Sequence, residues 1–352
     1  MHPVLETPAA LAEVLPLLAP HDRIPIDTEA DSLHCYFEKL CLIQISVPGV
    51  DLLIDPLADL PLQPLFAALE GKELAIHGAD YDLRLLRRVG YGGPARVFDT
   101  MIGARLCGFA EFSLAALIAK YFNVQLAKAS QKANWARRPL PPQMTDYAVK
   151  DTHYLLEISN IIETTLKELG RWEWFQQSCE RAIVASTIIR ERDPDQLWRI
   201  TGSNDFRGRG AGILRALWQW RDVEAQAVDR PSFHILHNEQ LLEATDRFEK
   251  GLEVDYPQLR SGRRTRFYEA ANGAMALPES EWPQIIRKPR SRHSREEELR
   301  FKDLKTKRDK IATELKLDPS LIAPKLVLEN LAANPDETAS RMMPWQRAAL
   351  GV

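Results

Sequence analysis

No stretch of the sequence holds eighteen or more consecutive apolar residues, the length that a helix needs to cross a membrane. The 352 residues therefore offer no membrane span. Residues 1–18 have no basic segment ahead of their apolar residues, so we expect an amphipathic helix there and not a signal peptide.

Cysteine is scarce, and its spacing matches neither a metal finger nor a CxxC redox motif. Such cysteines are typical of reduced, mostly buried side chains, and we expect a cytoplasmic protein. The four are Cys35, Cys41, Cys107 and Cys179.

A large excess of one charge is also absent, because 46 basic residues face 49 acidic ones and the net charge is −3. This excludes a histone-like basic character, so a polyanionic partner must be held by local patches or through metal ions. The length favours two or three domains of a globular protein that is 45% hydrophobic and 27% charged.

The first half of the chain alternates short apolar runs with stretches of helical period. Antiparallel strands followed by strand–helix alternation predict an α/β domain, a mixed sheet with helices on its faces. The expected strands are residues 23–29, 41–47, 51–54, 73–77 and 96–99. The expected helices are residues 63–69, 81–89, 100–106, 142–169 and a helix capped by Ser113 that runs to Phe122.

Beyond Trp172 the pattern is helical throughout, and residues 283–295 are typical of a linker. The two helical regions repeat an order weakly: a helix with Arg221 or Arg308, a Pro-Ser loop, then an apolar helix. The expected domains are residues 1–170, a helical connector 171–195, a module 196–275, a linker 276–297 and a second module 298–352.

Asp27 and Glu29 are two residues apart on an expected strand, so their side chains share a face. Neighbouring acids repel one another, which favours a divalent cation between them. Simple solvation at the end of a strand explains the pair equally well.

Tyr147 and Asp151 are four residues apart on an expected helix and therefore share a face one turn apart. An acid on an inward-facing stripe usually has a partner. An ordinary half-buried tyrosine and an exposed acid remain the alternative.

Asp80 and Asp82 follow an expected strand at the start of a helix, where negative charge is favoured. Helix capping could explain either residue. Asp80 is the natural cap and Asp82 the better functional candidate, although spacing alone does not decide between them.

Together these segments deliver four carboxylates from separate elements, with a phenol that could position a water. Hard oxygen ligands suit Mg²⁺ or Mn²⁺ and not zinc. Two such ions about 4 Å apart would clamp the attacking and leaving oxygens of a phosphodiester.

The segments DTE at 27–29, HGADYDLRLL at 77–86 and YAVKDTHYLL at 147–156 resemble the three motifs of the DEDD exonuclease superfamily. Tyr147, four residues before Asp151, matches the tyrosine subtype, and within it the chain resembles the bacterial ribonuclease D family. KLCLIQIS at 39–46, FDTMIGARL at 98–106 and KASQKANWARRPL at 128–140 support this, and both helical regions resemble HRDC domains.

The resemblance implies a ribonuclease H-like exonuclease fold followed by two HRDC-like domains. It implies two divalent ions, Mg²⁺ or Mn²⁺. One is held by Asp27, Glu29 and Asp151, with Tyr147 helping to orient the water. The other is held mainly by Asp27, with Asp82 acting through water, and the motif selects Asp82 over Asp80.

The same resemblance points to residues that could contact a terminal nucleotide or the strand behind it. Two positions depart from the usual pattern, Ala30 after DTE and Ala133-Asn134 before Trp135, which affects the packing of the nucleotide and not the metal chemistry. A solvated loop anchored by Trp135 is the alternative for this segment. The candidate substrate-binding residues are Thr28, His77, Lys128, Trp135, Arg137 and Arg138.

The function implied is 3′→5′ hydrolysis of single-stranded RNA with release of nucleoside 5′-monophosphates, in the maturation of tRNA precursors, by a monomer. The basic stretches 206–210 and 260–266, taken as loops, could add RNA contacts or be solvated surface. The alternatives are a single-strand DNA exonuclease and a non-catalytic RNA-binding scaffold.

Overall fold

The computed structural model describes residues 3–126, 132–188, 193–284 and 294–352. It divides the chain into two compact units. Unit 1 comprises Met1–Ala30, Leu40–Ile189 and Ser291–Val352, and unit 2 comprises Asp31–Lys39 and Arg190–Arg290. No helix among the described residues is long and apolar enough to span a membrane.

A six-stranded mixed sheet forms the centre of unit 1, in the order β1-β4-β3-β2-β5-β6. The pairs β2–β3 and β3–β4 are antiparallel, whereas β1–β4, β2–β5 and β5–β6 are parallel. This confirms the expected α/β fold with a mixed sheet. The strands are β1 (Val4–Leu5), β2 (Arg23–Ala30), β3 (Leu40–Val47), β4 (Val50–Ile54), β5 (Glu73–Ile76) and β6 (Arg96–Asp99).

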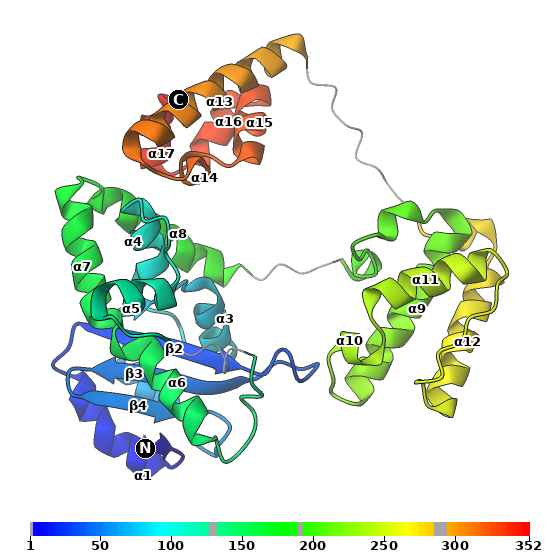
Figure 1. The fold of residues 1–352 in the computed structure, drawn as a ribbon, viewed down its shortest axis with the longest axis horizontal. Helices are drawn as coiled ribbons and strands as arrows, with labels where there is room; N and C mark the ends of the chain where they lie inside the picture. The colour runs from blue at the N-terminus through cyan, green and yellow to red at the C-terminus, as the bar shows by residue number, and fades with distance from the viewer. Residues whose placement is uncertain (1–2, 127–131, 189–192, 285–293) are drawn as a thin grey trace. The chain divides into compact units, whose positions relative to one another are not determined.

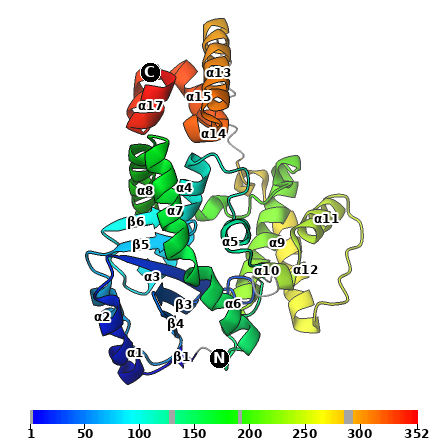
Figure 2. The same cartoon turned by 60° about the vertical axis from the view of Figure 1, so that its left-hand side comes forward.

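Helices cover both faces of this sheet because its central strands are apolar on both sides. One face carries a core that includes Ile24, Ile26, Ile43 and Ile45, all fully buried. On the other face α6 crosses β2, β3 and β4 (Figure 1). Further along the sheet α8 packs on β6 (Figure 2). The helices of this part are α1 (Pro8–Val14), α2 (Gln63–Ala68), α3 (Asp80–Arg88), α4 (Thr100–Leu106), α5 (Leu114–Phe122), α6 (Pro142–His153), α7 (Leu155–Glu168) and α8 (Trp172–Thr187).

The C-terminal helices belong to unit 1 and share a hydrophobic core with α4, α7 and α8. Trp345 stacks on Trp174 with ring centroids 5.0 Å apart, and its backbone N–H donates to Oε1 of Gln177 at 3.0 Å. Arg171 donates to the carbonyl of Leu315 at 2.7 Å. These helices are α13 (Arg295–Leu315), α14 (Pro319–Ile322), α15 (Lys325–Ala333), α16 (Pro335–Ser340) and α17 (Pro344–Leu350).

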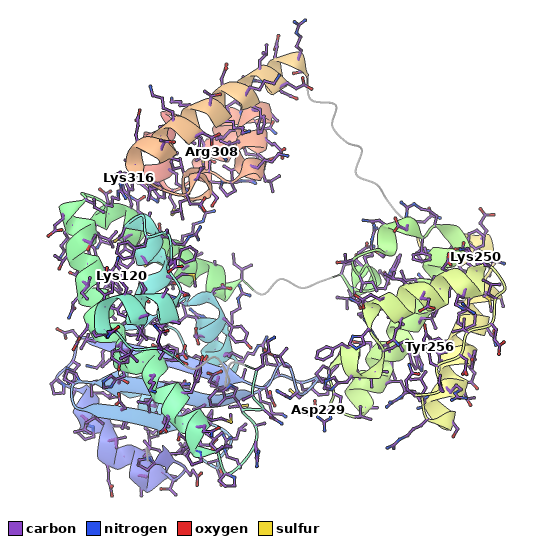
Figure 3. All side chains as sticks on the ribbon, viewed as in Figure 1. Lys120, Asp229, Lys250, Tyr256, Arg308 and Lys316 are labelled. Atoms are coloured by element: carbon purple, nitrogen blue, oxygen red, sulfur yellow. The ribbon has the colours of Figure 1, made fainter. Side chains whose placement is uncertain are left out.

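Unit 2 is helical, with its own core around Trp198, Trp220 and Phe267. The segment Asp31–Lys39 belongs to it, because the Asp229 carboxylate (labelled in Figure 3) accepts the backbone N–H groups of Tyr36 and Phe37, each at 3.0 Å. Its helices are α9 (Gly208–Ala227), α10 (Ser232–Ile235), α11 (Asn238–Glu249) and α12 (Ser261–Met275). Short 3₁₀ turns lie at Leu15–Leu18 in unit 1 and at Pro194–Gln196, Ser203–Asp205 and Glu279–Glu281 in unit 2.

The N-terminal segment corrects the expectation of one continuous helix. Val4 and Leu5 instead pair in parallel with Leu53 and Ile54, and the helix begins only at Pro8, where the Thr7 hydroxyl accepts the N–H of Ala10. Two apolar residues gain more from completing the edge of the sheet than from extending a short helix.

The expected helix at residues 142–169 is also divided, into α6 and α7, at Tyr154. Most other boundaries agree with the expectation within one residue. Ser113 caps α5 as expected, since its hydroxyl accepts the N–H of Ala116 at 3.2 Å.

Candidate active site

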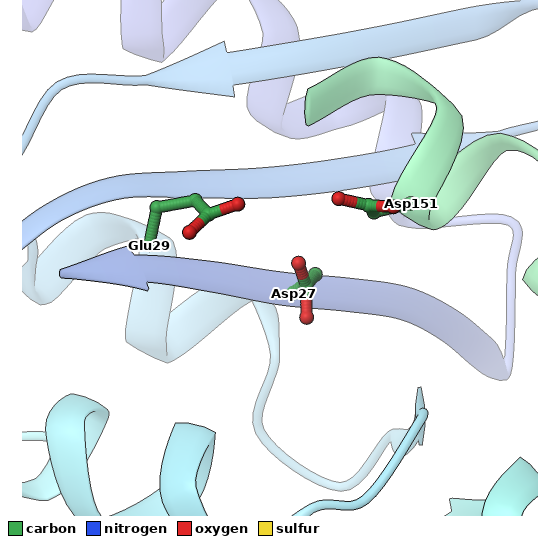
Figure 4. A group of neighbouring side chains, drawn as sticks. All are labelled: Asp27, Glu29 and Asp151. Carbon is green, nitrogen blue, oxygen red and sulfur yellow. The ribbon is translucent and has the colours of Figure 1, made fainter. Parts of the chain in front are cut away.

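The strand β2 carries two of the candidate acids on one face. Asp27 and Glu29 are half-buried and point toward α6 (Figure 4). Ile24 and Ile26 enter the core on the opposite face of the sheet. This is the alternation expected of a strand, so the sequence spacing alone predicted their common direction.

Helix α6 supplies the third acid. Ala148 and Val149 pack toward the sheet, and the hydroxyls of Thr152 and Ser46 lie 2.7 Å apart, which holds the helix on β3. The buried Asp151 side chain then faces β2, and carboxylate oxygens of Asp27, Glu29 and Asp151 all lie within 4.8 Å of one another. Burial raises the pKa of the Asp151 carboxyl, and a hydrogen bond donated by the Tyr147 hydroxyl offsets part of that rise, so the phenol is part of the same arrangement.

Asp82 lies outside this group of three but is oriented by β2. It is buried in the first turn of α3, and its Oδ1 accepts a hydrogen bond from the Thr28 hydroxyl at 2.5 Å. Its charge is the largest electrostatic contribution from another acid to the raised pKa of Asp27. The fourth acid is therefore an electrostatic neighbour of Asp27 and Glu29.

Asp80 does not cap α3, contrary to the expectation. The cap residue is Ala79, and Asp80 is exposed and pairs with Arg84 one turn later. No side chain caps α3. The Asp99 carboxylate at the end of β6 accepts the N–H groups of Gly78 at 3.0 Å and Ala79 at 2.8 Å, just before the helix, and it caps α4. Nothing in the local sequence of α3 signals this contact with Asp99.

Burial raises the pKa of every acid in the site, and repulsion from the other site acids raises it further for Asp27 and Glu29. Desolvation is the largest cause in each case; it raises the pKa of Glu29 to about 9, of Asp151 to about 7 and of Asp82 to about 6. The pKa of Asp27 is also raised well above its usual value, by burial and then by the other three carboxylates. Such a group cannot be fully ionised near neutral pH without a compensating positive charge. The donor set therefore fits a hard divalent cation.

Comparison with known proteins agrees with this geometry. Residues 3–167 match the family model of the 3′–5′ exonuclease domain, and residues 211–251 match that of the HRDC domain. Ribonuclease D of Gluconacetobacter diazotrophicus is 28% identical over 362 residues, covering 99% of this chain and 90% of that protein. Ribonuclease D of Zymomonas mobilis is 32% identical over 246 residues, covering 68% of this chain and 63% of that protein.

The chain belongs to the ribonuclease D family. The enzyme class of its N-terminal domain is 3′–5′ exonuclease. The Escherichia coli RNase D structure has the same fold, with a TM-score of 0.71 at 23% identity and coverage of 98% of this chain and 92% of that one. A Bifidobacterium adolescentis protein has a TM-score of 0.84 at 24% identity, covering 99% of this chain and 94% of that one.

Two of the expected substrate-binding residues, Thr28 and His77, contact other side chains of this ribonuclease D family member. The Thr28 hydroxyl is used by Asp82. Nδ1 of His77 lies 2.9 Å from the Thr100 hydroxyl, and burial lowers the pKa of the ring, so the imidazole is neutral near pH 7. Thr28 therefore supports one of the acids, and His77 supports the start of α4 through Thr100.

The expected RNA-contact segment before α6 is mostly structural. Trp135 is 1% exposed and packs beside Tyr147 with ring centroids 6.2 Å apart, so it offers no open face for a base. Arg138 pairs with Asp55 and donates to the carbonyl of Cys41 at 2.7 Å. Arg137 is exposed, and Lys128 lies outside the described residues. The anchoring interpretation of Trp135 is the one that the structure supports.

The basic stretch 260–266 is not a loop, contrary to the expectation, because α12 begins at Ser261. Two of its arginines, Arg263 and Arg266, pair with the buried Glu224 on α9 at 3.0 and 2.5 Å. Part of its charge therefore holds two helices together. Glu224 follows Arg221 on a helical face, and nothing in the local sequence signals its two partners.

Proposed function

We propose that this chain removes nucleotides from the 3′ ends of single-stranded RNA by hydrolysis and releases nucleoside 5′-monophosphates. The observation that carries the proposal is the group of three converging carboxylates, Asp27, Glu29 and Asp151. Tyr147 is hydrogen-bonded to Asp151. RNA is favoured as the substrate because the relatives named above are ribonucleases.

Two divalent cations, Mg²⁺ or Mn²⁺, complete the proposed site. Asp27, Glu29 and Asp151 would hold one, and Asp27 with Asp82 the other. Bound there, the ions would supply Lewis acidity and lower the pKa of a coordinated water. The chain's own acids do not serve as the base, because their negative charge is needed for the cations.

The surrounding side chains position these groups. The Tyr147 hydroxyl, beside Asp151, can also hold a water in line with the phosphorus atom of the terminal phosphodiester. Thr28 keeps Asp82 in one rotamer by its hydrogen bond. Fixing four charged side chains before the substrate arrives reduces the reorganisation that the reaction requires.

We further propose tRNA precursors as the cellular substrate, a monomeric state and a cytoplasmic location. The described cysteines are all free thiols, which agrees with a reducing compartment. Among the candidates that the structure describes, exposed Arg137 remains for contact with the RNA backbone near the site.

The test is an assay of 3′-end trimming with end-labelled single-stranded RNA and DNA. We expect RNA trimming that needs Mg²⁺ or Mn²⁺, stops with EDTA, and falls at least about 100-fold in Asp27→Ala and in Asp82→Ala. The matched control is Asp80→Ala, which removes an exposed acid from the same turn of α3 and should retain wild-type activity.

Activity that survives EDTA or Asp27→Ala would refute the metal-dependent site. Equal trimming of DNA and RNA would refute the preference for RNA. A loss in Asp80→Ala equal to that in Asp82→Ala would refute the assignment of Asp82.

A further inference from the structure

The residue opposite Asp27 in the sheet is an uncharged amide, Gln44. On β3 it is the direct antiparallel partner of Asp27, and on its other side it is the partner of Leu53 on β4. Cross-strand partners carry their side chains on the same face, so Gln44 points to the face covered by α6. Ser46, two residues further along β3, confirms this face through its contact with Thr152 of α6.

Gln44 is fully buried, yet neither Nε2 nor Oε1 has a hydrogen-bond partner. Across the described parts of the chain, every other side chain with a buried, unpaired polar atom has only one such atom. A buried amide without partners costs stability, and a residue such as leucine or methionine would fill the same space without that cost. A buried amide that lacks partners beside a candidate active site is explained if it gains a hydrogen bond when the site is occupied.

We propose that Gln44 is a positioning residue for Asp27, and that its amide nitrogen donates a hydrogen bond to the Asp27 carboxylate when the acids hold their cations. The inference rests on the proposed function of the site. Ligating carboxylates generally need a second hydrogen bond that fixes which oxygen faces the ion.

The charge of the site explains why an amide suits this position. Asp27 lies among three other carboxylates, so a lysine or arginine opposite it would neutralise the group and compete with the cations. Another acid would add to the repulsion. An amide donates a hydrogen bond with no net charge, and it is long enough to reach across one pair of strands.

The variant Gln44→Met tests this, since it keeps the shape of the side chain and removes both polar atoms. The matched control is Leu53→Met, a volume-conserving change at a buried position in the same cross-strand row. Calorimetric titration with Mn²⁺ alone, trimming kinetics and cation-free melting are measured for each protein.

We expect Gln44→Met to bind Mn²⁺ about 10- to 100-fold more weakly, with a similar fall in kcat at saturating Mn²⁺ and an unchanged KM for RNA. Its cation-free melting temperature should equal or exceed that of the wild type, because the unpaired amide is gone. Leu53→Met should match the wild type in Mn²⁺ affinity and in kcat. A purely structural role would lower the melting temperature and leave Mn²⁺ affinity unchanged.

Mn²⁺ affinity and kcat of Gln44→Met within about twofold of the wild type would overturn the role of Gln44. If Asp27→Ala retained activity, the proposed function itself would fail, which is a separate outcome. Should no Gln44 variant fold, the wild-type crystal structure with Mn²⁺ decides, because a distance from Nε2 to Asp27 beyond about 3.2 Å excludes the hydrogen bond.

Discussion

At the scale of single residues, the fold buries the acids of the site, which makes their ionised form less favourable than it is in water. Their folded-state pKa values, about 9 for Glu29, about 7 for Asp151 and about 6 for Asp82, lie above those of an unfolded chain. The folded protein therefore binds more protons than the unfolded one across this range, and its stability falls as pH rises through it. A cation bound at the proposed site would replace those protons.

This predicts a pH-dependent stabilisation by Mg²⁺. We expect the rise in melting temperature on adding Mg²⁺ to be small at about pH 5 and to grow towards about pH 9, where the cation-free site carries most negative charge. Differential scanning fluorimetry in Mg²⁺ and in EDTA measures it, with Asp27→Asn as the control that weakens binding. A stabilisation that does not change with pH would contradict the assignment.

Residue spacing predicted which acids share a face but not which side chains support them. The DxE and YxxxD spacings follow from strand and helix periods, so Asp27, Glu29, Tyr147 and Asp151 could be expected to converge once the segments met. The burial of Trp135 could not be expected, because it depends on how its segment packs against the strands. The same holds for Gln44, whose place opposite Asp27 depends on the register of β2 and β3.

At the scale of elements, each of the two helical modules contains the same kind of contact, a hydrogen bond from an arginine to a backbone carbonyl, which we call the backbone clamp. Arg221 on α9 donates to the carbonyl of Leu236 at 3.0 Å, and Arg308 on α13 (labelled in Figure 3) donates to the carbonyl of Ala323 at 2.9 Å. Each carbonyl lies 15 residues beyond its arginine and directly follows a short helix, α10 or α14. The weak sequence repeat therefore corresponds to a repeated structural contact.

The clamp predicts a specific loss of stability. Arg308→Met should reduce the free energy of unfolding by about 1–3 kcal/mol, because the Ala323 carbonyl loses its charged partner. Urea unfolding followed by circular dichroism measures it. The control is Arg300→Met on the exposed side of the same helix, and equal losses in both variants would argue against the clamp.

The elements also indicate where local sequence stops being informative. Strands β2 to β6 were predictable because apolar runs and helical periods alternate clearly. The edge strand β1 was not, since Val4 and Leu5 become a strand only by pairing with β4. The division at Tyr154 between α6 and α7 has no proline or glycine to mark it.

At the scale of the whole molecule, the compact units do not follow the order of the domains along the sequence, because unit 1 combines the first and the last parts of the chain. The second helical module comes last in the chain but shares a core with the catalytic part, through Trp345 on Trp174 and Arg171 on the carbonyl of Leu315. Sequence patterns mark where a module begins and ends. They do not reveal which apolar faces it buries.

Two deletions should therefore have opposite effects. Truncation after Ile189 removes Trp345 and exposes the core residues that it covers, so we expect a large loss of stability and aggregation. Replacing Arg190–Arg290 with a Gly/Ser linker keeps the core of unit 1 intact. That protein should fold and bind Mn²⁺ like the full chain, because Asp27, Glu29, Asp82 and Asp151 all lie in unit 1.

RNA binding distinguishes the roles of the two units further, because the residues removed by the internal deletion include the HRDC domain and its basic side chains. If these contact RNA, the internal deletion should raise the KM for a long RNA and weaken its salt dependence, while kcat on a saturating short oligonucleotide stays close to that of the full chain. Trimming kinetics at two salt concentrations measure both. An unchanged KM would remove the HRDC domain from substrate binding, and a collapse of kcat would mean that unit 2 supports the catalytic residues themselves.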